Sequence, residues 1–149
     1  PLAQRKPQIE PAQVGIKRLT VKAPAKLPYL TMGYHVPVLR NANTDWEPYA
    51  LEMLAGVLDG NESARLNKEL VRERRIANST GAGYDSTARG PGMFYLYGTP
   101  SEGKTAAELE TALRSEMEKL MLDGVTEEEL ARVKAQIAGS ADLNATVAV

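Results

Sequence analysis

The chain has 149 residues, 43% of them hydrophobic and 25% charged, a composition typical of one globular domain large enough to bury a core. Its 18 basic and 19 acidic residues leave a net charge of −1, which argues against a general nucleic-acid partner, and no apolar run is long enough for a membrane span. Cysteine is absent and His35 is the single histidine, which excludes disulfides, thiolate chemistry and a two-histidine zinc site within this chain.

The first 26 residues are rich in proline and charge and lack an apolar period, which predicts an interdomain linker. Within it, residues 15–21 (GIKRLTV) predict an edge strand. Residues 27–36 (LPYLTMGYHV) carry β-branched and aromatic side chains up to Pro37 and predict the first strand of a domain that we place at residues 27–149. The last residues (ADLNATVAV) contain no stop signal, so we expect this domain to be incomplete at its C-terminus.

Three capping boxes, each with a threonine followed three residues later by a glutamate, predict the starts of helices at Thr44–Glu47, Thr105–Glu108 and Thr126–Glu129. The helices that they open cover about residues 45–58, 105–122 and 126–137. A further helix is predicted over residues 63–75, with Leu66, Leu70 and Val71 on its inward face.

Between the second and third predicted helices the apolar period changes to two. Residues 77–87 and 93–99 predict paired strands, joined by the turn-rich residues 88–92 (ARGPG). The order β-α-α-β-β-α-α predicts an α+β domain with helices packed on an antiparallel or mixed sheet.

The run LVRERRIANSTGAGYD at residues 70–85 contains two patterns that would suit a ligand. Gly81 and Gly83 begin a G-x-G-x-x-G pattern, but Ser86 replaces the third glycine and the run follows a helix instead of preceding one. Small residues beside a close neighbouring element are the simpler interpretation. The arginines complement a helix C-terminus and lack the interleaved aromatics of a nucleic-acid surface. We interpret His35, alone on a strand, as structural.

The order of these segments resembles the pitrilysin/insulinase-type zinc metallopeptidases, specifically their second, C-terminal repeat domain. Residues 54–70 (LAGVLDGNESARLNKEL) resemble the family's "vL-gg--SrL---L" segment, and residues 71–77 (VRERRIA) match its "LRE---LAY" segment. Residues 90–98, 108–120 and 126–136 match the hairpin strand, the long helix and the acidic helix that follow. The likeness extends from about residue 10 onward.

The resemblance implies a LuxS/mitochondrial-processing-peptidase-like metallohydrolase fold. The family binds zinc through an inverted His-x-x-Glu-His motif in another domain, and that motif is absent here. Zinc would therefore be bound by an N-terminal zinc-binding domain or a partner subunit, and no catalytic or metal-binding residue is expected in this chain. Its role would be to close over a peptide substrate and exclude water.

Some family members direct an arginine and a tyrosine from this half toward the substrate. Arg72 stands at the arginine position, and Asn78 stands at the tyrosine position when a one-residue gap is allowed. Asparagine can still donate a hydrogen bond, although it is shorter and has no phenol. Arg72 and Asn78 are therefore the candidate substrate-binding residues.

Three functions follow for comparison with the structure. The first is the substrate-clamping half of a zinc-dependent endopeptidase, acting on extended peptides held partly by strand addition. The alternative is a catalytically inactive structural or assembly subunit of the same fold. The third is a small-molecule or nucleic-acid binding module, for which we expect no salt-dependent polynucleotide binding. The sequence leaves the compartment open, and a bacterial periplasm or cell envelope is the location that we name for comparison.

Overall fold

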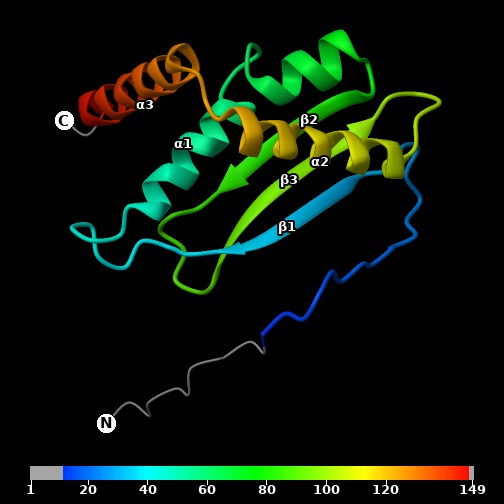
Figure 1. Ribbon diagram of the computed structural model, residues 1–149, viewed down its shortest axis with the longest axis horizontal. Coiled ribbons are helices and arrows are strands. Elements are labelled where there is room, and N and C mark those ends of the chain that lie inside the picture. Colours follow the sequence, from blue (N-terminus) through cyan, green and yellow to red (C-terminus); the bar gives the residue numbers. More distant parts are fainter. Residues whose placement is uncertain (1–11, 148–149) are drawn as a thin grey trace.

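The computed structural model describes residues 12–147, with side chains described for residues 12–139. Three antiparallel strands form one sheet in the order β1–β3–β2, with bounds Leu30–Val36, Gly92–Pro100 and Ala77–Tyr84 respectively. The α-helices are α1 (Glu47–Asp59), α2 (Ala106–Asp123) and α3 (Glu127–Val147), and a π-helix, η1, covers Asn67–Glu73. This is the α+β architecture that the sequence predicts (Figure 1).

The strands form where the side chains alternate and carry no formal charge. None of the three contains Asp, Glu, Lys or Arg, and β3 alternates buried with more exposed residues along its whole length. In the β2–β3 pair, Ala82 lies opposite Leu96 and Gly81 lies opposite Tyr97. Because side chains alternate between faces, one face of the sheet is apolar and the other carries tyrosines.

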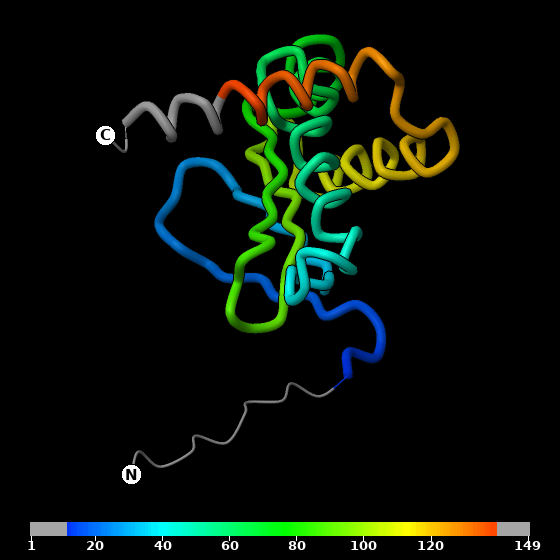
Figure 2. The backbone as a smooth tube through the Cα atoms, turned by 90° about the vertical axis from the view of Figure 1, so that its left-hand side faces the viewer, coloured from blue at the N-terminus to red at the C-terminus, as the bar shows by residue number. Residues whose placement is uncertain are grey.

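The core fills the space between the apolar face of the sheet and the helices. Met32, Phe94 and Leu96 lie on the strands, and the helical side chains packed with them are Leu58, Leu66, Leu70, Leu109, Ala112 and Leu113. Figure 2, turned by 90° from Figure 1, shows α1 and α2 on one side of the strands and the segment before β1 on the other. The two-layer arrangement therefore leaves the tyrosine-bearing face without a covering helix among the described residues.

Glycine in β2 is required by an aromatic ring, which agrees with the interpretation of this run as a close approach between elements. A Cβ placed on Gly81 would lie 2.3 to 2.6 Å from atoms of the Tyr97 ring. The Tyr97 ring also lies near Tyr29, with 6.4 Å between the ring centroids. The Tyr97 side chain opposite Gly81 therefore explains this glycine without a phosphate ligand.

Two of the three predicted capping boxes are formed. Thr105 and Glu108 make the reciprocal bonds at the start of α2, and Thr126 and Glu129 make them at the start of α3. Gly124 follows α2 with a positive φ of 74°, which glycine adopts without strain.

The capping box predicted at Thr44 and Glu47 is wrong. Helix α1 begins at Glu47 after Trp46, which makes no side-chain cap, and the Thr44 hydroxyl donates to the Asp45 carboxylate at 3.0 Å. Asp45 in turn accepts the backbone N–H groups of Arg40 and Asn41, at 2.9 and 2.8 Å. This carboxylate therefore organises the preceding turn, and the helix begins later than its spacing predicts.

The edge strand predicted over residues 15–21 is not formed either. Residues 12–29 contain no strand, and apolar side chains in this segment are largely exposed, for example Val14 at 94% and Leu19 at 87%. Arg18 joins the segment to α2 through two hydrogen bonds to Glu110, at 2.5 and 2.9 Å. The alternation is present, but no described strand lies beside it to complete a ladder. Residues 1–11 of the predicted linker lie outside the described residues.

Between residues 12 and 147, no helix combines the length and the apolar character that a membrane crossing would need.

Candidate functional site

The junction between η1 and β2 differs from an ordinary helix end. The Arg74 N–H donates to the Glu69 carbonyl, five residues back, and the Ile76 N–H donates to the Leu70 carbonyl, at 3.0 and 2.9 Å. The first of these bonds spans five residues, the spacing that defines a π-helix, a conformation often found at functional sites; the second spans six. The sequence predicted a helix over residues 63–75, and the structure replaces its second half with this wider turn.

Arg75 lies at the centre of this junction in a left-handed backbone conformation. Its φ is 50°, and it is the one described residue other than glycine with a positive φ. Such a conformation costs of order 1 kcal/mol for a residue with a Cβ, and it is usually found where neighbouring bonds over-determine the backbone. Here the bonds made by Arg74 and Ile76 hold the residue on both sides.

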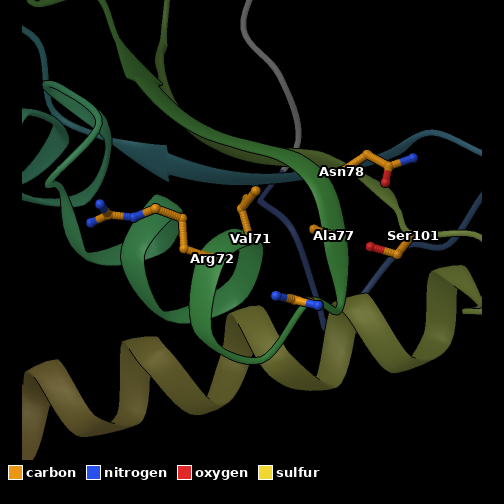
Figure 3. A pocket seen from close by; sticks show the side chains of 6 residues that line it. Val71, Arg72, Ala77, Asn78 and Ser101 are labelled. Carbon is orange, nitrogen blue, oxygen red and sulfur yellow. The ribbon is translucent and has the colours of Figure 1, made fainter.

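An open hollow of about 540 Å³ lies at this junction. Figure 3 shows its lining, which comes from three places in the chain: the end of η1, the start of β2 and the residue after β3. The lining residues are Val71, Arg72, Arg75, Ala77, Asn78 and Ser101. Ser101 is held there because its N–H donates to the Ile76 carbonyl at 2.9 Å.

Both predicted substrate-binding residues, Arg72 and Asn78, line this hollow. Their polar ends point in different directions, with Val71 and Ala77 between them (Figure 3). Neither side chain forms a hydrogen bond or an ion pair with another described residue, so their donors are available to a ligand. One compact group would not reach both donors; an extended ligand would suit them better.

The arginines of the RERR run are not equivalent. Arg74 pairs with Glu116 at 3.3 Å, and the same carboxylate accepts Lys119 at 2.8 Å while being only 3% exposed. Arg74 therefore has a structural role. Arg72 and Arg75 line the hollow and have no acidic partner among the described residues.

Sequence reasoning did not identify Arg75 and Ser101. The signal for Arg75 was present, since an arginine occupies a position after a helix where glycine is the usual residue. Ser101 has no local signal, because only the pairing of β2 with β3 brings it beside Ala77.

The outer edge of β2 lies beside the hollow. Because β2 is an edge strand, alternate N–H and C=O groups point away from β3. At Ala82 the outward N–H donates to the Asp59 carboxylate at 3.2 Å, and burial raises the pKa of Asp59. Asp59 therefore occupies one outward N–H of this edge, at Ala82.

The described residues do not fit a zinc ion. Among the side chains described for residues 12–139, no three histidine, aspartate or glutamate groups lie where they could share a metal ion. His35 is exposed on β1, on the face of the sheet away from the helices. With one imidazole and no cluster of three possible ligands among the described residues, the donor set lacks what a zinc site requires.

A second hollow, of about 400 Å³, lies where α1 meets the start of α3. Its lining is apolar and consists of Ala50, Met53, Leu54, Val57, Val125 and Leu130. It offers no side-chain donor to orient a polar ligand, so the hollow beside Arg72 is the better candidate site.

The chain matches one protein family and several solved structures. The family model described as the peptidase M16 inactive domain matches residues 1–137. No curated protein matches this chain.

Three of the similar structures share the fold at 19% to 23% identity. A protease from Helicobacter pylori has a TM-score of 0.71 at 23% identity, over 86% of this chain and 29% of that one. A candidate zinc protease from Bordetella pertussis Tohama I has a TM-score of 0.64 at 20% identity, over 75% of this chain and 59% of that one. The inactive peptidase domain of a candidate zinc protease from Bordetella parapertussis has a TM-score of 0.66 at 19% identity, over 82% and 63%. The chain thus spans less than two thirds of each.

Proposed function

Because this chain belongs to the peptidase M16 inactive-domain family, we propose that it is the non-zinc-binding half of a zinc-dependent endopeptidase. In this proposal the chain closes over an extended peptide and positions it against a zinc-binding domain or subunit outside the chain. The observation that carries the proposal is the family match over residues 1–137, which covers the described site in full.

The site supports this function through the kind of groups it offers. Arg72 and Arg75 offer guanidinium donors, and Asn78 and Ser101 add neutral donors. The apolar side chains of Val71 and Ala77 complete the lining. Peptide carbonyls and carboxylates accept such hydrogen bonds. The outer edge of β2 could add backbone bonds to an extended segment, as in other cases of strand addition.

In this role the chain acts by binding and orienting. Closure of two domains around a substrate excludes water and holds the reacting groups at a productive distance. The zinc ion, bound elsewhere, would supply the Lewis acid of a metallopeptidase. Arg72 would hold the peptide in register from the opposite wall.

A test uses the full-length protein together with any partner subunit. We expect cleavage of an unstructured reporter peptide, abolished by a chelator. We also expect Arg72→Gln to lower kcat/KM by about tenfold to a hundredfold, the loss associated with one charged hydrogen bond of about 1.5 to 3 kcal/mol. Arg89→Gln is the matched control, because Arg89 lies in the loop after β2, away from the hollow, and its removal changes the net charge equally.

The second candidate function is a catalytically inactive structural or assembly subunit. Asn78 favours it, because this position has no phenol to offer an oxyanion or a substrate. Absence of chelator-sensitive turnover in the complete protein would favour this role and reject the endopeptidase. Turnover unaffected by Arg72→Gln would retain the enzyme and remove Arg72 from its site.

A further inference from the structure

We propose that the hollow between η1 and β2 binds an acidic residue of the peptide, and that Arg75 determines this preference. The inference rests on the proposed function, since it assumes that the hollow meets a peptide. It adds a substrate class, and it adds Arg75, which the family-like segments of the sequence do not indicate.

The charge of the lining carries the first step. Of the six lining residues, two are arginines and none is acidic, although the chain as a whole has a net charge of −1. The guanidinium stays protonated at any physiological pH. The closest acidic side chain in sequence on η1, Glu73, faces Lys68 at 3.8 Å, and Lys68 also lies 3.6 Å from Glu69. Both glutamates of η1 lie near Lys68, so the two arginines give the hollow a local positive charge.

The contrast with other arginines carries the second step. Four of the nine arginines between residues 12 and 139 pair with glutamate, in Arg18–Glu110, Arg65–Glu129, Arg74–Glu116 and Arg114–Glu110. Arg72 and Arg75 have no such partner among the described residues, yet they share one hollow. An external carboxylate would complete the same pairing, with the bidentate geometry that guanidinium groups favour.

The backbone of Arg75 carries the third step. A left-handed residue directs its side chain differently from a helical one, and here it leaves the side chain lining the hollow between Val71 and Ala77. The Cα is held by the hydrogen bonds of Arg74 and Ile76, so less backbone freedom is lost when a ligand binds. Glycine would fit this conformation with less strain, so an arginine at this position is consistent with a use for its side chain.

The expected ligand is therefore an extended segment. Its carboxylate would meet Arg75, its neighbouring apolar atoms would cover Val71 and Ala77, and its polar groups would reach Arg72 on one side or Asn78 on the other (Figure 3). A peptide with Asp or Glu at one position satisfies this arrangement, and a small inorganic anion would occupy only part of it.

The test compares two fluorescent peptides of equal length that differ by Glu or Gln at one position. Binding to the full-length protein is measured by anisotropy, with a chelator present so that no peptide is cleaved. We expect the Glu peptide to bind about tenfold more tightly, and the difference to shrink as salt is added. Arg75→Gln should remove the preference, Arg75→Lys should keep part of it, and Arg89→Gln should leave it intact.

A charge-reversed variant separates the loss of the Arg75 charge from unfolding of the variant, because an unfolded protein would not gain affinity for a peptide of opposite charge. The Arg75→Glu variant should bind a third peptide, with Lys at the same position, more tightly than the Glu peptide. Equal binding of the Glu and Gln peptides, unchanged by Arg75→Gln, would overturn the inference and leave the proposed peptide-binding function intact. Failure of all three peptides to bind the unaltered protein would overturn both.

Discussion

At the residue scale, Arg75 shows how one backbone angle places a side chain in the lining of the hollow. Its φ of 50° lies in a region that glycine enters without cost, and the residue lies between the π-helical turn and β2. Arg72, on the same turn, was identified from its place in a motif, whereas the contribution of Arg75 depends on this conformation. The sequence therefore contained the residue but not the reason that it lines the hollow.

The stability of an Arg75→Gly variant tests this strain. Glycine removes the left-handed penalty of about 1 kcal/mol and adds some chain entropy to the unfolded state, so the free energy of unfolding should rise by about 0.5 to 1 kcal/mol. Urea denaturation measures it. Arg75→Ala is the control, since alanine keeps the Cβ and should give no rise. A glycine variant no more stable than the alanine variant would contradict the strain.

At the element scale, threonine hydroxyls accept free backbone N–H groups at the starts of α2 and α3. The sequence contains three capping boxes of the same type, and two are formed, at the starts of α2 and α3. At the third, the neighbouring Asp45 carboxylate accepts two N–H groups of the turn before α1. It also accepts a hydrogen bond from the Thr44 hydroxyl. Spacing alone does not decide which acceptor a loop N–H will use.

Matched alanine substitutions separate the formed box from the unformed one. Thr105→Ala should lower the free energy of unfolding by about 1 kcal/mol, because the Glu108 N–H loses its acceptor at the start of α2. Thr44→Ala should change it by less than about 0.5 kcal/mol, since its hydroxyl contacts only an exposed carboxylate. Thermal or urea denaturation of both variants measures this, and equal losses would contradict the assignment of the caps.

At the scale of the whole molecule, two carboxylates join segments that are far apart in the chain. Glu129 of α3 accepts two hydrogen bonds from Arg65, at 2.5 and 2.7 Å, and the same arginine donates to the Gly124 carbonyl. Glu110 of α2 accepts Arg18 from the segment before β1. These bonds lower the pKa of both glutamates to about 2, from an ordinary value of 4.5. The pKa values fall because hydrogen-bonded arginine stabilises the charged carboxylate.

These pKa values predict acid sensitivity of the assembled helices. A pKa lower in the folded state than in the unfolded one contributes stability above about pH 5, and this stability is lost as the pH falls toward 2. Glu129→Gln should lower the free energy of unfolding by about 2 kcal/mol at neutral pH and flatten its decline between pH 5 and pH 2. Glu127→Gln, in the same first turn of α3, is the control. A steep decline that persists in Glu129→Gln would contradict this role for the Arg65 pair.

The sequence by itself determined the order of the elements, the β2–β3 pairing, the caps of α2 and α3, and the lack of a two-histidine zinc site. Each of these depends on residue counts or on patterns within a few residues. Only the tertiary structure decided that Ser101 joins Arg72 and Asn78, that Arg75 adopts a left-handed conformation, and that residues 15–21 stay unpaired among the described residues. These features depend on contacts between distant segments, whose free energies outweigh local preferences.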